Sequence, residues 1–439
     1  MSIFFLNRQN IIRNHLDFIT ISFYIISNTI AESCDVMKAC GLIVEYNPFH
    51  NGHKYHFESS KEKTNADVTV AVMSGSFLQR GEPAIIDKFH RTKAALSHGV
   101  DIIIELPFVY AVQYADLFAH GSVQLLSSLG VDTVCFGSEE GSIEPFKDAY
   151  KTYIKNEKKF KKKLHENLDL GQSFPTASRN AYDEIGLVSN TIDLGQPNNI
   201  LGFSYVKAAA SMPNQINVDT IQRTKSGYHD PTINEDIASA TSIRKEIISV
   251  NELTKGAIQA LPDATIEQLK AYQRENGQWH DWSYYFPFLR YLIETKSIEE
   301  LQQIHGMEEG LEYRMKQTIK EADDFEGWMK LLKTKRYTWT RIQRVLTHLL
   351  TNTKKEEIES IKKLEEAPYI RILGMSKNGR EFIQQQKKQL DQPLIANLQE
   401  FEHPMLQIEE RASDAYYSVL SSTQKKRMKK QELTGPILL

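Results

Sequence analysis

Short apolar runs alternate with helix-forming segments through the first half of this chain. Four runs have the length of strands and end at turn-forming residues: Lys38–Glu45, Asp67–Met73, Ile102–Leu106 and Val131–Phe136. Amphipathic segments of helical length separate them. Apolar strands separated by helices predict βαβ units and therefore a doubly wound α/β domain with a parallel sheet. We expect the turns after the strands to meet at one edge of that sheet, where such folds bind ligands.

Residues typical of helix ends support the predicted alternation of strands and helices. One helix is predicted to begin at Asp87, a preferred N-cap residue, and to stop at Gly99; another spans 115–129 and ends before Gly130. Residues 143–185 are predicted to form two helices, and a further helix and strand are predicted up to Ile221.

From about residue 250 the spacing becomes purely helical. Apolar residues recur every three or four positions in Phe286–Ile293, Ile298–Ile304, Leu311–Ile319 and Ile342–Leu350. We expect no strand here, and we interpret Pro368–Met375 as a tight turn that presents Arg371. The pattern therefore predicts an α/β domain over residues 37–250, followed by an all-helical domain over residues 251–439.

Residues 1–36 do not fit either domain. Their apolar run, Phe18–Ile26, is interrupted by Thr and Ser and is far shorter than the roughly 20 residues that span a bilayer. A signal peptide cleaved near Ile30–Cys34 is one interpretation. We favour the other, in which translation starts at Met37, directly before the first strand, and residues 1–36 are an upstream extension or a disordered tail.

Composition narrows the classes of function. The 439 residues are 41% hydrophobic and 25% charged, which is ordinary for a globular chain, and the formal net charge is −3. A near-neutral total gives no global signal for nucleic acid, so such a site must be a local basic surface. Three cysteines without metal-site spacing argue against a disulfide framework or a zinc site and favour a reducing compartment.

The turn after the first strand carries the clearest candidate chemistry. His50, Gly52 and His53 form an H-x-G-H arrangement between a strand and a helix. A helix N-terminus favours phosphate, the glycine permits close approach, and the imidazoles can donate to oxygens that gain charge at an attacked phosphate. Ordinary turn histidines are the alternative. Their placement between strand and helix favours a nucleotide site, in which Glu45 would fix a histidine tautomer, bind a ribose hydroxyl or cap the turn.

A second group of phosphate-binding candidates lies before residue 250. Ser239–Arg244 opens a helix with hydroxyls, including that of Ser242, and the guanidinium of Arg244, which suits the β- and γ-phosphates of ATP. Arg223 follows a strand in the same half of the sheet. Asn198 or Asn199 is expected to cap its helix, and Lys88 and Arg91 are expected on a helix surface.

Three basic stretches are candidates for nucleic-acid contact. Residues 333–344 hold five cations and two aromatic residues, Tyr337 and Trp339, and contain no acid. Cations bind the phosphate backbone, and aromatic rings stack on unpaired bases. A nucleic-acid contact surface and a plain loop followed by an amphipathic helix are about equally good interpretations of this stretch. Residues 425–430 and the lysines of 155–163 are more simply solvated faces. The chain lacks a P-loop, a G-x-S-x-G elbow and an H-E-x-x-H site.

Longer motifs identify a resemblance. Residues 45–53, 73–83, 197–202 and 336–341, together with the S-x-T-x-I-R element at 239–244, resemble the tRNA(Met) cytidine acetate ligase family of the nucleotidylyltransferase superfamily. The resemblance covers Met37 to the C-terminus. It implies a Rossmann-like sheet of the nucleotidylyltransferase type and a two-step reaction. Acetate and ATP give acetyl-adenylate, and the acetyl group then passes to the wobble cytidine of elongator tRNA(Met), giving N(4)-acetylcytidine.

The resemblance also implies the roles of individual residues. His50 and His53 would stabilise the transition state at the α-phosphate. The residues expected to contact ATP are Ile43, Val44, Glu45, Tyr46, Asn47, Pro48, Phe49, His50, Asn51, Gly52, His53, Lys54, Tyr55, His56, Gly137, Asn198 or Asn199, and Arg223, with Ser242 and Arg244 added from the chemistry above. Those expected to contact tRNA are Lys335, Arg336, Trp339, Arg341 and Arg344. Magnesium is expected as a phosphate partner, although no carboxylate cluster that would hold it is evident in the sequence.

The expected partners are ATP, acetate and tRNA(Met), with no membrane, and the expected location is the cytoplasm, because ATP is not supplied outside the cell. Two other classes stay open. One is a nucleotidylyltransferase that moves AMP onto a small phosphate ester, which the long helical half disfavours. The other is a non-catalytic RNA-binding protein, which the joint presence of H-x-G-H, Arg223 and S-x-T-x-I-R disfavours.

Overall fold

The computed structural model describes residues 36–187, 192–223, 238–364 and 366–439. Lys38–Leu439 forms one compact unit. The expectation for residues 1–36 therefore falls almost wholly outside the described residues.

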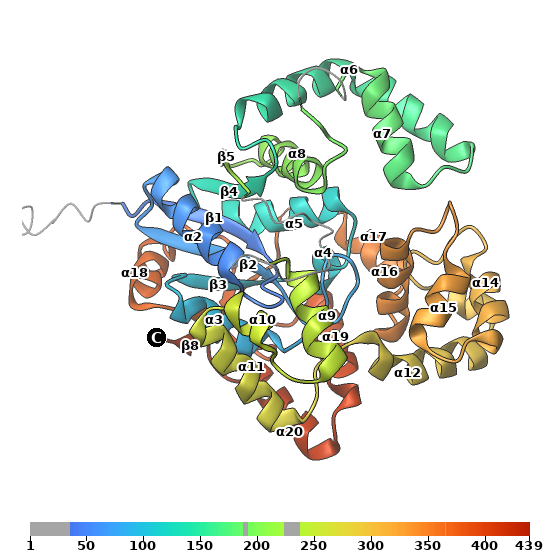
Figure 1. The fold of residues 1–439 in the computed structure, drawn as a ribbon. Helices are drawn as coiled ribbons and strands as arrows, with labels where there is room; N and C mark the ends of the chain where they lie inside the picture. The colour runs from blue at the N-terminus through green and yellow to red at the C-terminus, as the bar shows by residue number, and fades with distance from the viewer. Residues whose placement is uncertain (1–35, 188–191, 224–237, 365) are drawn as a thin grey trace, which may run out of the picture. The chain divides into compact units, whose positions relative to one another are not determined.

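A mainly parallel sheet lies at the centre of this unit (Figure 1). Within the described residues its strand order is β5-β4-β1-β2-β3-β6-β7, and β8 pairs with β6. The strands are β1 Ala39–Val44, β2 Val68–Ser74, β3 Ile102–Leu106, β4 Thr133–Ser138, β5 Asn217–Gln222, β6 Ile370–Met375, β7 Leu394–Ile395 and β8 Ile437–Leu438. The first five are mutually parallel, as predicted, because the connections between them carry helices.

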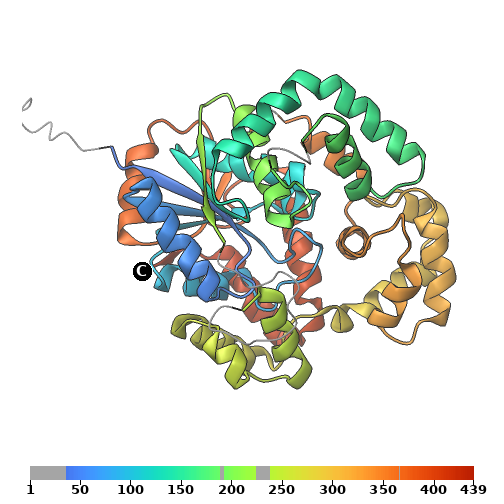
Figure 2. The same cartoon turned by 45° about the horizontal axis from the view of Figure 1, so that its top comes forward.

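Helices cover both faces of the sheet (Figure 2). Successive residues of β1 face opposite sides of the sheet. The Cys40 thiol reaches the Ser60 carbonyl of helix α2 (Asn51–Thr64) on one face, at 3.9 Å. A side chain at Gly41 would lie 2.8 Å from Leu126 of helix α5 (Ala115–Ser128) on the other face. The helices up to residue 250 are α2 Asn51–Thr64, α3 Lys88–Ser97, α4 Phe108–Ala111, α5 Ala115–Ser128, α6 Glu144–Asp169, α7 Phe174–Glu184, α8 Pro197–Ala210 and α9 Ala240–Val250. The predicted doubly wound α/β architecture is confirmed.

Helices dominate the rest of the chain, as predicted. They are α10 Lys255–Gln259, α11 Asp263–Asn276, α12 Trp282–Thr295, α13 Ile298–Gln302, α14 Leu311–Thr318, α15 Phe325–Leu332, α16 Trp339–Leu350, α17 Lys355–Ile361, α18 Lys377–Gln386, α19 Pro404–Tyr416 and α20 Ser422–Lys430. Short 3₁₀ turns at Ile319–Glu321, Tyr417–Val419 and Gln431–Leu433 complete the set.

The expectation of no strand after residue 250 is wrong, because β6, β7 and β8 all lie there. Pro368–Met375 is not a turn: it contains β6, which pairs antiparallel with β3 and so extends the sheet. The charged Arg371 within this apolar run obscured the strand. Its side chain is 1% exposed and is neutralised by Glu105 of β3 and Glu432, at 2.7 and 2.8 Å.

The same buried ion cluster corrects the expectation for Lys88. Its ammonium group is fully buried and lies 2.5 Å from Glu105, 3.0 Å from Glu432 and 3.6 Å from Glu409. We call Lys88, Glu105, Arg371, Glu409 and Glu432 the buried ion cluster. It joins α3 and β3 to the C-terminal segment.

Arg91, also expected on the surface, is 1% exposed. Its guanidinium donates to the carbonyls of Glu45, Ser74 and Gly75 and so holds the ends of β1 and β2 together.

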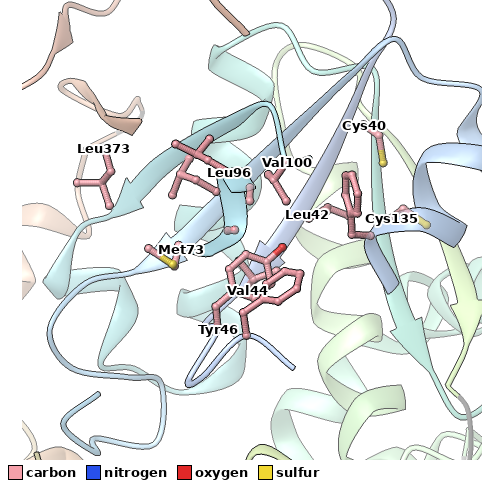
Figure 3. Packing of buried hydrophobic residues seen from close by; sticks show 14 of the residues in the cluster. Cys40, Leu42, Val44, Tyr46, Met73, Leu96, Val100, Cys135 and Leu373 are labelled. Atoms are coloured by element: carbon pink, nitrogen blue, oxygen red, sulfur yellow. The ribbon is translucent and has the colours of Figure 1, made fainter. Parts of the chain in front are cut away.

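The core between the sheet and α2 and α3 is apolar and continuous. Leu42, Val44, Met73, Leu96 and Cys135 pack there, with Tyr46 at the end of β1 (Figure 3). Burial raises the pKa of the Cys40 thiol to about 11, so this thiol stays protonated and serves packing. Among the described residues, no helix has both the length and the apolarity that crossing a membrane requires.

Candidate active site

The turn between β1 and α2 places two histidines at a helix N-terminus. His50 is the N-cap of α2, and its Nδ1 accepts a hydrogen bond from the backbone N–H of Gly52 at 3.0 Å. The Nδ1 of His53 accepts from the backbone N–H of His50 at 3.4 Å. The two rings stack with their centroids 3.9 Å apart. The sequence-based pairing of His50 and His53 at a strand-to-helix turn is therefore what the structure shows.

The hydrogen bonds differ between the two rings. The Nδ1 of His50 accepts a hydrogen bond, so its neutral ring carries the proton on Nε2, whereas the ring of His53 also hydrogen-bonds to the backbone of Pro48. Burial lowers the pKa of His50 to about 3, and the positive charges of Arg223 and Arg244 act in the same direction. Burial and the neighbouring His50 likewise hold the pKa of His53 well below its ordinary value. At neutral pH both rings are therefore uncharged.

The backbone before His50 is held in a costly conformation. Tyr46 has φ of 48°, in the left-handed region that side chains disfavour, at a cost on the order of 1–3 kcal/mol. Its ring packs edge-on against Phe49 and His53, at centroid distances of 4.7 and 5.1 Å. Glu45, at the end of the strand, accepts from the backbone N–H of Gln79 at 2.8 Å and so caps a neighbouring turn.

Asn47 links this turn to two other segments. Its side-chain oxygen accepts from the backbone N–H of Ile85 at 2.8 Å, and its backbone carbonyl accepts from Arg244 at 2.9 Å. Its amide nitrogen is buried and has no hydrogen-bond partner within the described part of the chain. A buried donor of this kind is costly unless a ligand accepts from it.

Arg244 is brought to the turn, as the sequence suggested, but it is not free. Its second guanidinium nitrogen donates to Glu82 at 2.8 Å. Ser242 is buried, and its hydroxyl donates to the Ser239 carbonyl at 2.8 Å while Ser239 caps α9. The hydroxyls therefore close the helix end, and Arg244 provides the charge.

Gly137, His56 and Arg223 form the opposite side of the site. A side chain at Gly137 would lie 3.1 Å from the Arg223 side chain and 3.9 Å from the His56 ring, so these groups pack over the glycine. Burial lowers the pKa of His56 to about 4, with Arg223 acting in the same direction. Residues 224–237, which follow Arg223 in the chain, lie outside the described residues.

Asn198 and Asn199 lie next to this group through Glu139. The Glu139 carboxylate accepts from the Asn198 side chain at 2.6 Å and from the Asn199 backbone at 2.8 Å. The Asn199 side chain in turn accepts from the backbone of Glu139 and Glu140, at 3.1 Å each. The expectation that an asparagine caps α8 is wrong: Gln196 is the N-cap, and Glu139 satisfies the helix end.

The remaining residues predicted to contact ATP differ in how far they are exposed to solvent. Val44, Pro48 and Phe49 are buried, and Ile43 and Gly52 are partly buried. The Asn51 backbone N–H and side chain donate to the carbonyls of Ala260 and Gln259, both at 3.0 Å. Lys54 and Tyr55 are exposed, and Lys54 lies 4.0 Å from Glu58.

The basic stretch predicted to contact tRNA is partly neutralised. Arg336 and Arg341 both pair with Glu309, at 2.8 and 2.7 Å, so an acid that is distant in sequence compensates two of the cations. Lys335 is exposed, and Trp339, the first residue of α16, is partly buried.

Helix α16 is in direct contact with the loops of the site. Thr347 donates to the Gly81 carbonyl at 2.5 Å, and His348 contacts the Val112 carbonyl at 3.1 Å. Gly81 has φ of +84°, and a side chain there would lie 2.5 Å from the Arg344 backbone, so glycine permits this close approach. Since Glu82 pairs with Arg244, one loop connects the basic helix with the histidine turn.

Three acids in these arrangements were not anticipated from the sequence: Glu82, Glu139 and Glu309. Glu82 and Glu139 lie within or beside motif stretches, which was the only available signal. The partners of Glu82 and Glu139 lie 59 or more positions away in the sequence, so no local spacing reveals these contacts.

A protein-held metal does not fit the site. No group of three or more His, Cys, Asp or Glu side chains in the described ranges could hold an ion. The nearest acids, Glu82 and Glu139, are occupied by Arg244 and by Asn198 and Asn199.

Comparisons with known proteins show which family the chain belongs to. Residues 37–432 match the family HIGH Nucleotidyl Transferase. The tRNA(Met) cytidine acetate ligase of Oceanobacillus iheyensis is 52% identical over 404 residues, which cover 92% of this chain and 100% of that relative. The enzyme of the same name from Bacillus subtilis is 45% identical, over 87% of this chain and 92% of its own length.

A solved structure shows the same fold. The crystal structure of Thermotoga maritima TmcAL bound with alpha-thio ATP is similar with a TM-score of 0.81 and 32% identity, covering 92% of this chain and 100% of that one. A second structure of that protein, without the nucleotide, gives a TM-score of 0.82. This chain belongs to the HIGH Nucleotidyl Transferase family, and within it to the tRNA(Met) cytidine acetate ligases.

Proposed function

We propose that this chain is an ATP-dependent acetate ligase that acetylates the wobble cytidine of elongator tRNA(Met). The observation that carries the proposal is the pair of neutral histidines at the N-terminus of α2, beside two guanidinium groups, in a chain 52% identical to a named tRNA(Met) cytidine acetate ligase. The product is N(4)-acetylcytidine.

In the first step, an acetate oxygen attacks the α-phosphorus of ATP. A bond forms between that oxygen and phosphorus, the bond to the bridging oxygen breaks, and pyrophosphate leaves with the electron pair. The ring N–H groups of His50 and His53 donate to α-phosphate oxygens as charge develops there, and Arg223 and Arg244 balance the charge of the other phosphates. Acetate is a poor nucleophile, so positioning supplies much of the rate.

In the second step, the exocyclic amine of cytidine attacks the acetyl carbonyl of the adenylate. A carbon–nitrogen bond forms, the bond to the phosphate oxygen breaks, and AMP leaves while the amine loses a proton. The base must be unstacked to reach the adenylate. We propose that residues 37–250 bind ATP and that the helical remainder, through Lys335, Arg336, Trp339, Arg341 and Arg344, binds tRNA. The contact of α16 with the 79–82 loop supports this division of roles.

Magnesium is proposed only as a companion of the ATP phosphates. Its charge would assist departure of pyrophosphate, and none of the steps above assigns it a protein ligand. A cytoplasmic location is proposed because both ATP and tRNA are supplied there.

The decisive experiment is ATP–pyrophosphate exchange with a series of small carboxylates. Exchange that depends on acetate and proceeds without tRNA is expected. If no carboxylate supports exchange, the ligase proposal fails, and AMP transfer to a phosphate ester becomes the reaction to assay. An absence of any heat on ATP titration would instead indicate a non-catalytic RNA-binding protein.

The acceptor is tested in cells. Elongator tRNA(Met) from a strain that lacks this gene should carry unmodified cytidine at the wobble position, and the gene should restore N(4)-acetylcytidine. Retention of the modification in the deletion strain would contradict the proposed acceptor.

A further inference from the structure

Two exposed aromatic rings lie together near the site although they belong to separate segments. Tyr114 precedes α5 and is 41% exposed; Phe174 begins α7 and is 47% exposed. Their ring centroids are 6.1 Å apart, and the ring planes are inclined by 52°. Because the rings do not stack on each other, their faces are available to a third planar group.

We propose that Tyr114 and Phe174 form a stacking platform for an unpaired base of the tRNA anticodon loop, next to the wobble cytidine. This inference rests on the proposed function and extends it to a contact surface outside the basic stretch. We call the two residues the aromatic platform.

Hydrogen bonds connect the platform with the histidine turn. The Gln79 side chain donates to the carbonyl of Gln113, the residue before Tyr114, at 2.9 Å. The Gln79 backbone donates to Glu45, at the end of β1, at 2.8 Å. Tyr114 thus lies after β3, beside a loop that is tied to the strand end leading into His50, and Phe174 of α7 packs against it.

The cationic helix α16 borders the same loop. His348 of α16 contacts the carbonyl of Val112, two residues before Tyr114, and Arg344 lies one helical turn before His348. Arg344 is partly buried, and no acidic side chain of the described ranges forms an ion pair with it.

The acids nearest the platform are balanced. Asp116 pairs with Lys207 at 2.8 Å, and Glu359 pairs with Lys362 at 2.7 Å. The surroundings therefore retain an uncompensated positive charge at Arg344, which complements a phosphate backbone.

The chemistry of the reaction explains why a base is the fitting occupant. Extruding the wobble cytidine removes a stacking partner from each neighbouring base. A tilted pair of rings can replace that partner, as in other proteins that bind single strands. A protein partner would bring its own apolar surface, whereas the platform is only two rings bordered by charges.

Truncation of each ring tests the proposal. Tyr114→Ala and Phe174→Ala should each raise the Kd for tRNA(Met) by about 5- to 150-fold, the range for loss of one base–aromatic stack. Acetate-dependent ATP–pyrophosphate exchange should be unchanged, since it does not involve tRNA. Tyr114→Phe and Phe174→Tyr keep a ring and should bind tRNA like the unmodified protein.

A fluorescent base gives a direct readout. A synthetic anticodon stem-loop that carries 2-aminopurine beside the wobble cytidine should lose fluorescence on binding, and Phe174→Ala should abolish that quenching. Tyr291→Ala is the matched control, because it removes another exposed ring (66%), on α12, and should change neither tRNA affinity nor quenching.

Unchanged tRNA affinity in both alanine variants, with exchange intact, would overturn the platform and leave the proposed function standing. A change of oligomeric state in these variants without loss of tRNA affinity would assign the rings to a protein interface, which also overturns it. Failure of the unmodified protein to bind tRNA would instead refute the proposed function itself.

Discussion

In the proposed reaction, His50 and His53 are uncharged donors, because their surroundings disfavour the charged form. Burial is the main cause, and two guanidinium groups near His50 add to it. A neutral imidazole can donate one hydrogen bond to a phosphate oxygen without first losing a strong attraction to the ground-state anion, so its contribution can grow as charge develops.

Removal of one donor should therefore act on the rate. His50→Ala and His53→Ala should each lower acetate-dependent ATP–pyrophosphate exchange by roughly 10²–10³, or about 3 kcal/mol of transition-state stabilisation, with a smaller effect on ATP binding. Glu58→Gln, an exposed change on the same helix, is the control. A variant that loses ATP binding but keeps its maximal rate would contradict the donor role.

The pH dependence follows from the same pKa values. The pKa of His50 is lowered to about 3 and that of His56 to about 4, so these rings stay neutral at neutral pH. The exchange rate should therefore show no inflection near pH 6.5, between about pH 5 and 8. An inflection there that disappears in His53→Ala would show that a charged imidazole acts.

The lowered histidine pKa values also determine how the stability of the fold changes with pH. A histidine kept neutral in the folded state binds fewer protons than in the unfolded state once the pH falls below its ordinary pKa of 6.5. Each such ring therefore contributes stability that is present above pH 6.5 and is lost as the pH falls towards its folded-state pKa.

At the scale of elements, the buried ion cluster explains how a C-terminal strand joins an N-terminal sheet. β6 carries Arg371 into the interior, and Glu105, Glu432 and Lys88 surround it. Glu409 is the third acid of the cluster. Burial and the neighbouring Glu105 raise the pKa of Glu409, so its carboxyl is protonated at neutral pH and the cluster holds two charges of each sign.

This arrangement predicts unequal effects of similar substitutions. Glu105→Gln should destabilise the fold by about 3–5 kcal/mol, because it leaves buried cations unbalanced. Glu409→Gln should cost far less, since an amide replaces a neutral carboxyl. Denaturant unfolding of the two variants at pH 7 is the measurement, and equal losses would mean that Glu409 is charged.

The pH profile provides a second test of Glu409. With a raised folded-state pKa, Glu409 contributes stability that is present below its unfolded value of about 4.5 and is lost as the pH rises through the folded-state pKa. The Glu409→Gln variant should therefore gain stability relative to the unmodified protein as the pH increases above 4.5. A difference that stays constant with pH would contradict the assignment.

At the scale of the whole molecule, the contact of α16 with the 79–82 loop is one of the places where the C-terminal half meets the N-terminal half. Cations at the start of this helix lie on one side of the contact, and the Glu82–Arg244 pair lies on the other. The basic surface is weaker than its sequence suggests, because Glu309 neutralises Arg336 and Arg341. The cations of residues 333–344 that Glu309 does not neutralise are Lys333, Lys335 and Arg344.

Lys335→Glu combined with Arg344→Gln should therefore weaken tRNA binding while acetate-dependent exchange survives. The salt dependence should fall as well, by about 0.7–0.9 in the slope of log K against log salt for each phosphate that the variant no longer neutralises. Lys330→Glu, an exposed change on α15 outside the basic stretch, serves as the control. Loss of exchange together with tRNA binding would indicate misfolding or a different role for these cations.

The local features of this protein were predictable from its sequence. Strands β1 to β4, the Asp87 cap and the histidine turn depend on residues within a few positions of one another, so spacing and residue type determine them. The roles of the ATP and tRNA residues came partly from motif resemblance and partly from residue chemistry, and these assignments remain predictions.

Only the tertiary structure decided which distant residues meet. The pairing of β6 with β3 and the ion pair between Arg371 and Glu105 join segments that are far apart in the sequence, 266 residues for the ion pair. The acids that bind Arg244, Asn198 and Arg341 are likewise distant from them in the sequence. The same holds for Phe174, which packs against Tyr114. Such pairings depend on how the whole chain closes on itself, and no local periodicity encodes them. Sequence thus determined the turn that holds the histidines, and the fold decided which charges and rings surround it.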